Sequence, residues 1–327
     1  MRFIIYGAGG IGCVIGGHLF RQGETVALVG NAQHMDAINA RGLKLVTGDA
    51  NYVLKMPAYK SARELLPFQD DDIVFLCAKS QHTIKCLGQL KSAGAPRTLA
   101  IFCAQNSIVN EAVATRFFDR VYGVMIMIPA IFMTPGEVIN PIVRRNGVIE
   151  IGRYPTGADD VCQPVADALR RAGFFVNVNA NVMTSKAAKC LLNLGNAFDA
   201  INDGAGDSRA FLQAVRAEAM QVWRAAGIEW EESEQFTKRV RSKYGERRVP
   251  AGYENLEKRS SSWQSLARGT GNIEAEQLNG DVVMLGENLG IATPYNETLW
   301  RLAAEMAMRG DPPGKYSANE LMKMVQR

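Results

Sequence analysis

The spacing of hydrophobic and polar positions changes along the chain and predicts two parts. In the first half, short apolar runs at 3–6 and 25–29 flank a segment of helical spacing at 10–21. Further apolar runs at 73–76 and 99–102 are continuous, as in strands that are buried on both faces of a parallel sheet. The first half is therefore predicted to be an α/β domain with helices on both sides of its sheet.

After residue 121 the predicted strands follow one another more closely, and after about residue 180 the hydrophobic spacing is that of helices. Runs at 124–128, 137–139 and 148–151 are predicted to extend the sheet with antiparallel or mixed pairing, and 174–178 is its expected last strand. No strand pattern persists beyond about residue 180. Helical spacing recurs in four segments: 185–194, 210–226, 273–288 and 298–308. The predicted domains are residues 1–180, of α/β class, and residues 181–327, all helical.

Two shorter signals mark helix ends. Gly42 follows a short helical segment at 37–40 and is expected to end it. Thr293-Pro294 offers a capping oxygen followed by a proline at the first helical position, which predicts a helix start.

Composition and charge narrow the class of protein. The chain has 327 residues, of which 47% are hydrophobic and 21% charged, with a net charge of +4. This balance is typical of an ordinary globular protein with two domains, and the charge is too small to suggest a nucleic-acid partner. No apolar run is long enough for a membrane span, and residues 1–6 lead directly into glycines rather than into a secretory signal. We expect a cytoplasmic protein with no membrane partner.

Cysteine and histidine positions argue against metal and thiol chemistry. The six cysteines are scattered without a C-x-x-C pair, which is typical of buried thiols in a reducing compartment. His18, His34 and His82 are not spaced to share a metal or to pair with a nearby cysteine. No metal site is expected. A surface position is favoured for His34, with a place beside a phosphate as the alternative.

The segment Gly7-Ala8-Gly9-Gly10-Ile11-Gly12 matches G-x-G-x-x-G between a predicted strand and a predicted helix. In this context the first glycine makes a tight turn, the second admits a pyrophosphate and the third allows close packing of helix and strand. The helix N-terminus adds free N–H groups and a favourable dipole. The sequence therefore predicts a Rossmann-type, doubly wound domain that binds a dinucleotide through these six residues.

The end of the second predicted strand bears on the choice of dinucleotide. NAD sites usually carry Asp or Glu there and NADP sites an arginine nearby, whereas this chain has Gly30-Asn31. The absence of an acid removes a repulsion against a 2′-phosphate and tilts the expectation weakly toward NADP, with NAD still open. Asn31 is a candidate hydrogen-bonding residue for either cofactor.

Lys189 and Asn193 are four residues apart and so lie on one face of a predicted helix, among small and apolar neighbours. A lysine partly desolvated near a domain junction would have a lowered pKa and would donate a proton more readily near neutral pH. A lysine that merely extends its ammonium to solvent is the alternative.

Residues 229–248 hold acidic positions followed by six basic ones. A solvated helix face with a loop is the favoured interpretation, and a lid over an anionic ligand is the alternative.

Taken together, these motifs resemble the ketopantoate reductases (2-dehydropantoate 2-reductases) over nearly the whole chain. The resemblance rests on the glycine loop, Lys79 in Cys77-Ala78-Lys79-Ser80-Gln81, Asn106 in Ala104-Gln105-Asn106, and Lys189-x-x-x-Asn193. Ser262, Glu274 and the segment from Gly290 to Asn296 complete it. It implies NADPH-dependent reduction of ketopantoate or a related branched 2-oxo acid, a step of pantothenate biosynthesis. A homodimer is one candidate for the oligomeric state, which stays open.

The resemblance also implies roles for single residues. Lys189 would be the general acid that protonates the carbonyl oxygen, and Glu274 would hold it. Asn193 and Ser262 would bind substrate oxygens, while Asn106 and Lys79 would line the cofactor and substrate side of the cleft.

The chain departs from the family pattern at several positions. The arginine common in the family at the end of the second strand is replaced by Gly30-Asn31, and Arg259 stands where a substrate-binding asparagine is common. Asn196 lies one residue closer to Lys189 than the family's second asparagine, and residues 127–130 differ from its small-residue turn. We expect Arg259 to pair with a substrate carboxylate. Two other classes stay open: a β-hydroxyacid dehydrogenase-like oxidoreductase and a non-catalytic NADP-binding sensor.

Overall fold

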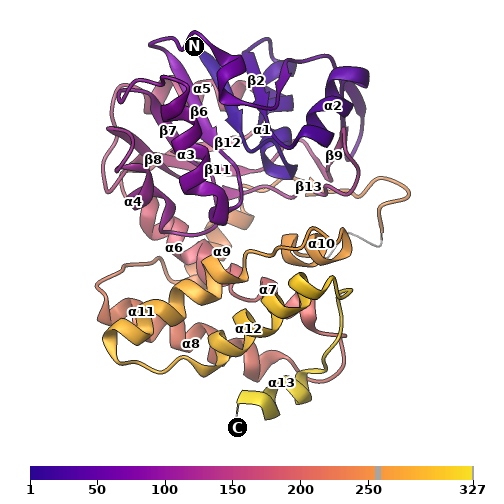
Figure 1. The fold of residues 1–327 in the computed structure, drawn as a ribbon, viewed down its shortest axis with the longest axis vertical. Coiled ribbons are helices and arrows are strands. Elements are labelled where there is room, and N and C mark those ends of the chain that lie inside the picture. The colour runs from indigo at the N-terminus through magenta and orange to yellow at the C-terminus, as the bar shows by residue number, and fades with distance from the viewer. Residues whose placement is uncertain (255–258, 326–327) are drawn as a thin grey trace. The chain divides into compact units, whose positions relative to one another are not determined.

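The computed structural model describes residues 1–254 and 259–325, and it divides the chain into two compact units (Figure 1). The first unit holds residues 1–186 together with the segment that begins at Glu234. The second holds residues 187–233 together with the described residues from Arg259 on. No helix in the described ranges combines the length and the apolar character that a membrane crossing requires.

The first unit is built on an eight-stranded sheet. In spatial order its strands are β12 (Phe175–Val178), β11 (Val148–Arg153), β8 (Arg120–Met127), β7 (Ala100–Cys103), β6 (Asp72–Leu76), β1 (Arg2–Tyr6), β2 (Thr25–Val29) and β5 (Ala58–Tyr59). The strands from β8 to β5 are parallel to one another, and β11 pairs antiparallel with β8 and parallel with β12. The predicted parallel sheet with a mixed extension is confirmed.

Both faces of this sheet are buried, which explains its continuous apolar runs. Phe3 and Ile5 of β1 enter one core cluster, while Ile4 and Tyr6 enter the other, because successive side chains point to opposite faces. The helices α1 (Gly10–Arg21), α2 (Ala32–Arg41) and α5 (Cys162–Arg171) contribute to the first cluster. The helices α3 (Thr83–Ser92) and α4 (Asn110–Ala114) contribute to the second. The expected helix at 37–40 is the end of α2, which ends at Gly42 as predicted.

Two small sheets lie beside the large one and correct two predictions. The run at 137–139 does not extend the main sheet: β9 (Glu137–Asn140) pairs with β3 (Leu43–Thr47), which also pairs with β4 (Asn51–Leu54). A strand also occurs beyond residue 180, since β13 (Glu246–Arg247) pairs with β10 (Ile142–Val143). The two residues of β13 are charged and exposed, so main-chain pairing alone defines the strand and no apolar pattern marks it.

The segment from Glu234 packs on the first unit, although the sequence places all residues after 180 in the helical domain. In α9 (Ser233–Arg241), Phe236 and Val240 are buried, and the Arg239 guanidinium pairs with the fully buried carboxylate of Glu150. The Tyr253 hydroxyl donates to Glu137 at 2.7 Å. Buried apolar and ionic contacts therefore hold much of the charged segment 229–248, which the sequence analysis favoured as a solvated face.

The second unit is helical. Its elements are α6 (Val182–Asn193, from Ala187 on), α7 (Asn196–Ile201), α8 (Arg209–Ala225), α10 (Ser261–Ala267), a π-helix η4 (Glu276–Gly280), α11 (Asp281–Leu289), α12 (Pro294–Arg309) and α13 (Ala318–Val325). The single helix predicted over 273–288 is thus a turn, a π-helix and an α-helix. Pro294 begins α12 as predicted, but the Thr293 side chain makes no capping bond; the Glu218 carboxylate accepts the N–H groups of Tyr295 and Asn296 instead.

A buried ion pair anchors the first half of α6 to the first unit. The Lys186 ammonium donates to the carbonyl of Cys103, the last residue of β7, at 2.7 Å and to the Glu111 carboxylate on α4. The two side chains are 2% and 0% exposed. Burial raises the pKa of the Glu111 carboxyl, and the charge of Lys186 opposes that rise.

Replacing one partner of this pair leaves an uncompensated buried charge. We expect Lys186→Met to lower the free energy of unfolding by about 3–5 kcal/mol, as measured by urea denaturation. The double variant Lys186→Met/Glu111→Leu removes both charges and should recover most of that loss. A single variant within about 1 kcal/mol of the parent would contradict this account of α6.

Candidate active site

The glycine loop connects β1 to α1 in the conformation that the motif predicts. Gly7 has a φ of +94°, and a Cβ there would lie 2.1 Å from the backbone nitrogen of Ala78. A Cβ on Gly12 would lie 2.8 Å from Ile5 Cγ2, whereas the nearest atom to a Cβ on Gly9 is 4.0 Å away. Gly7 and Gly12 are therefore required by packing, while Gly9 leaves open space at the N-terminus of α1, where N–H groups are free to bind phosphate.

Two of the expected site residues lie in turns at the carboxyl edge of the same sheet. Lys79 follows β6 and caps the short helix η2 (Ser80–His82), and Asn106 follows β7. Both side chains are partly buried. The carboxyl ends of parallel strands are where open α/β sheets bind ligands, so the glycine loop, Lys79 and Asn106 share the edge that suits a dinucleotide.

A buried polar network, which the sequence analysis missed, joins these two turns. The Gln105 amide donates to Thr83 Oγ1 at 2.7 Å, and the Thr83 hydroxyl donates to Asn110 Oδ1 at 2.7 Å. The Asn110 amide in turn donates to Ser80 Oγ at 3.1 Å. Ser80 and Gln105 belong to the two quoted segments, but Thr83 and Asn110 lie outside them, and only the fold brings the turns after β6 and β7 together.

The structure corrects the expectation for His34. Its side chain is 3% exposed, not at the surface, and its Nε2 lies 3.3 Å from the Cys13 sulfur despite 21 residues of separation. The Gly136 N–H donates to His34 Nδ1 at 2.8 Å, so the neutral ring carries its proton on Nε2. Burial raises the pKa of the Cys13 thiol, which leaves it protonated and unreactive. The contact is structural.

Asn31 has a local role at the end of β2. It is exposed, and its side-chain oxygen accepts the Gln33 N–H at 3.0 Å as the N-cap of α2. A contact between Asn31 and a cofactor stays a prediction.

In the second unit, Lys189 and Asn193 lie on one face of α6 as predicted. The Lys189 ammonium donates to Asn193 Oδ1 at 2.7 Å. Burial lowers the pKa of Lys189 to about 8. The Asn193 amide nitrogen is buried and has no hydrogen-bond partner among the residues described, so it is a donor available to a ligand.

Ser262 and Arg259 come from the start of α10. Ser262 is 3% exposed, and Arg259 is exposed with its guanidinium 4.9 Å from the centre of the Trp263 ring. Asp199 on α7 accepts the Ser260 N–H at 2.9 Å, which fixes the start of α10 beside the chain that follows α6.

Glu274 lies in the turn before the π-helix and is 8% exposed. Asn279 in that π-helix donates to the Leu194 carbonyl at 3.1 Å and to Asn296 Oδ1 at 3.0 Å, and so ties the π-helix to the end of α6. π-Helical turns occur often at functional sites. The pairing of Glu274 with Lys189 is not among the contacts described for the lysine and stays a prediction.

No group of His, Cys, Asp and Glu suited to a metal ion occurs in the described part of the chain.

Comparisons with known proteins now place this fold. The family model described as ketopantoate reductase PanE/ApbA matches residues 3–156, and the model of its C-terminal domain matches residues 177–307. The chain belongs to the ketopantoate reductase family. Membership in this family makes it an oxidoreductase of the ketopantoate reductase type, which acts on a CH–OH group by reduction of a 2-oxo acid.

Individual relatives agree with this assignment. A 2-dehydropantoate 2-reductase of Pyrococcus horikoshii is 27% identical over 310 residues, covering 92% of this chain and 96% of that protein. The crystal structure of a PanE/ApbA family ketopantoate reductase from Ralstonia eutropha JMP134 has a TM-score of 0.76 at 26% identity, covering 95% and 99% of the two chains. A D-mandelate dehydrogenase solved with NADH and anilino(oxo)acetate shares the fold at a TM-score of 0.77 and 21% identity, covering 95% and 100%.

The open space at Gly9 provides a test of dinucleotide binding that is separate from folding. We expect Gly9→Ala to unfold within about 2 °C of the parent but to bind a nicotinamide dinucleotide at least about tenfold more weakly, because its Cβ occupies the space for the pyrophosphate. Gly12→Ala is the packing control and should lose about 1–3 kcal/mol of stability through its clash with Ile5. Calorimetric titration and thermal unfolding measure both; parent affinity in Gly9→Ala would refute the assignment.

Proposed function

We propose that this chain reduces ketopantoate or a related branched 2-oxo acid to the 2-hydroxy acid, with NADPH as the hydride donor and Lys189 as the proton donor. The observation that carries the proposal is the environment of Lys189. Its ammonium is desolvated on α6, its pKa is lowered to about 8, and its hydrogen bond goes to a neutral amide. Such a group is protonated at neutral pH and gives up its proton readily.

The reaction determines what each residue does. The reduced nicotinamide supplies a hydride to the carbonyl carbon, and Lys189 gives its proton to the carbonyl oxygen, so that C=O becomes CH–OH. Negative charge develops on the oxygen as the C=O bond breaks, and a cationic donor stabilises that charge more than the neutral ketone. Glu274 would hold the lysine in position, and the free amide of Asn193 and the Ser262 hydroxyl would bind substrate oxygens.

The cofactor side is supported by the glycine loop and the turns after β6 and β7. The residues that would hold the dinucleotide are Gly7 to Gly12, Lys79 and Asn106, with Asn31 at the end of β2. The open space at Gly9 fits a pyrophosphate, and the N–H groups that begin α1 match its charge.

A second candidate function is oxidation of a 2-hydroxy acid with NAD. The likeness of the fold to D-mandelate dehydrogenase in complex with NADH supports it. Lys189 would then act as the base, because the same chemistry runs in reverse. The deciding experiment is a substrate panel. Consumption of NADPH or NADH is followed by absorbance with branched and linear 2-oxo acids, and reduction of NADP or NAD is followed with 2- and 3-hydroxy acids. Oxidation of 3-hydroxy acids alone would point to a β-hydroxyacid dehydrogenase, and cofactor binding without turnover to a sensor.

Arg259 is proposed to bind the substrate carboxylate. We expect Arg259→Ala to raise KM for 2-oxo acids at least about tenfold and to leave KM for the matching 2-oxo amides nearly unchanged, since the amides lack the charge that the guanidinium pairs with. Arg301→Ala, an exposed arginine of α12, is the control for loss of a surface charge. Equal effects on acids and amides would contradict this role.

The lowered pKa of Lys189 predicts the pH dependence of the reaction. Reduction needs the protonated lysine, so kcat/KM for reduction should fall as pH rises through about 8, and oxidation of the hydroxy acid should rise through the same range. Lys189→Ala should lose roughly 100-fold or more in kcat and lose this limb of the profile. Retention of the limb at about 8 in Lys189→Ala would exclude the lysine as the titrating group.

A further inference from the structure

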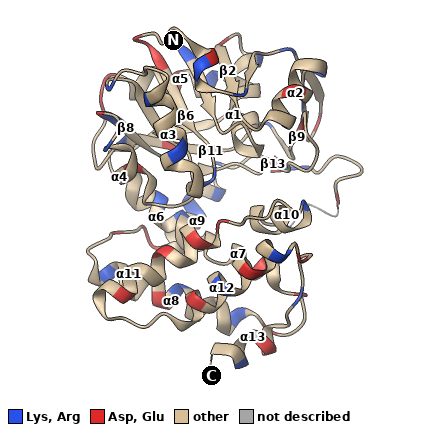
Figure 2. Ribbon diagram, viewed as in Figure 1, with Lys and Arg blue, Asp and Glu red and all other residues tan. Residues whose placement is uncertain are grey.

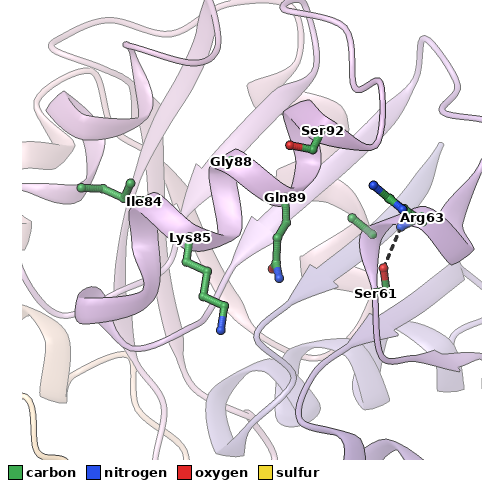
Figure 3. Close-up of a pocket in the computed structure, with 8 residues that line it drawn as sticks. Ser61, Arg63, Ile84, Lys85, Gly88, Gln89 and Ser92 are labelled. Atoms are coloured by element: carbon green, nitrogen blue, oxygen red, sulfur yellow. Dashed lines mark hydrogen bonds between the residues drawn. The ribbon is translucent and has the colours of Figure 1, made fainter.

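A surface groove of about 460 Å³ lies in the first unit between α3 and the short helix η1 (Ala62–Leu65), which follows β5 (Figure 3). Six of its lining side chains are Ser61, Arg63, Ile84, Lys85, Gln89 and Ser92. In Figure 3, Lys85 and Gln89 extend from α3 on one side, and Ser61 and Arg63 lie on the other. The volume is within the range of small-ligand sites.

The charge of this groove is of one sign. Arg63 and Lys85 are its two charged residues, and none of the eight lining residues is acidic. Both side chains are exposed, and neither forms an ion pair with any residue that the structure describes. The neighbouring Lys60, by contrast, is neutralised by Asp36 at 2.6 Å. Basic positions are also visible on α3 in Figure 2. The groove therefore presents two uncompensated cations to solvent.

Two hydrogen bonds connect the groove segments to the carboxyl ends of β1 and β2. Gln89, which lines it, accepts the hydroxyl of Tyr6 at 2.9 Å, and Tyr6 is the residue before Gly7. On the other wall, Tyr59 precedes the groove segment by two residues, and its carbonyl accepts the Gly30 N–H at 3.1 Å. Gly30 follows β2, the strand whose end meets the ribose of the adenosine half in Rossmann-type domains.

The charge of Lys85 also reaches the turn after β6. Burial lowers the pKa of the His82 imidazole, and the charges of Lys79 and Lys85 lower it further. Lys85 is therefore near enough to His82, in the turn after β6, for its charge to act there.

The end of β2 lacks its own cation. Asn31 is uncharged, and its side-chain oxygen caps α2 through Gln33, so the position that carries an arginine in many NADP sites supplies no positive charge here. We propose that Arg63 and Lys85 bind the 2′-phosphate of NADPH in this groove and are the residues that distinguish NADPH from NADH. This assignment rests on the proposed function in one respect, the use of NADPH as cofactor.

The chemistry of the two side chains suits a phosphate dianion. A guanidinium offers a planar fork that binds two phosphate oxygens, and an ammonium acts as a compact point charge. Ser61 adds a hydroxyl, and Ile84, 63% exposed, offers an apolar surface on which an adenine ring can lie. NADH has a neutral hydroxyl at the 2′ position, so the cations gain nothing from it.

The test measures dissociation constants, not activity. NADPH and NADH are titrated calorimetrically against the parent chain, Arg63→Ser, Lys85→Ser and Lys91→Ser, and adenosine 2′,5′-bisphosphate is compared with ADP as a competitor. Lys91 is the matched control because it loses the same charge from α3 outside the groove, where its ammonium donates to the Ala95 carbonyl. Thermal unfolding of each variant checks that it is folded.

We expect each groove variant to raise the dissociation constant of NADPH at least tenfold and that of NADH less than threefold. Lys91→Ser should change neither dissociation constant by more than threefold. The same groove variants should also lose the preference of the parent chain for adenosine 2′,5′-bisphosphate over ADP. The assignment is overturned if the groove variants bind both cofactors equally more weakly, or if they bind both as tightly as the parent chain does. A parent chain that binds the two cofactors equally also overturns it, and with it the choice of NADPH. Reduction of 2-oxo acids is scored separately by the substrate panel, so failure of the groove and failure of the reaction are distinguishable.

Discussion

The glycine loop and the turn after β6 meet at the carboxyl edge of the sheet through one close contact, the approach of the Gly7 backbone to Ala78. A single Cβ at Gly7 would overlap the backbone of Ala78, so the turn after β1 and the turn after β6 are in van der Waals contact only because that side chain is absent. The absence of a side chain at Gly12 likewise allows α1 to pack closely against β1. With these approaches made, Lys79, Asn106 and the N-terminus of α1 share one edge. The pairing of β6 with β7 brings polar residues that are far apart in sequence, such as Thr83 and Asn110, together beside this edge.

Helix α6 carries two lysines in opposite electrostatic settings. Lys186 is buried against a carboxylate and a carbonyl, so its charge is compensated and serves to anchor the helix. Lys189, three residues later, has lost water without gaining a carboxylate among its described contacts, and desolvation alone lowers its pKa. Residues three apart lie on neighbouring parts of a helix surface, yet the charge of Lys186 is paired and the pKa of Lys189 is lowered. The difference comes from what packs around each ammonium.

Discrimination between cofactors can move to a different element without a change of fold. The family pattern places a cation at the end of β2, where this chain uses Asn31 to cap α2. The cations of the proposed phosphate groove, Arg63 and Lys85, come instead from η1 and α3. Because a phosphate is recognised by charge and hydrogen bonds rather than by a particular backbone, several elements around one edge can supply the recognition.

The sequence by itself determined the strands of the large sheet except β5, the helices on both of its faces, the glycine loop and the shared face of Lys189 and Asn193. These features are local: a strand buried on both faces needs a continuous apolar run, a turn with positive φ needs glycine, and a four-residue spacing defines one helix face. The buried position of His34, the pairing of β9 with β3 and of β13 with β10, the docking of the segment after Glu234, and the network around Thr83 were decided by the tertiary structure alone. Each of these depends on residues 20 to more than 100 positions apart, and no periodicity along the chain encodes which distant partner will lie opposite a given side chain.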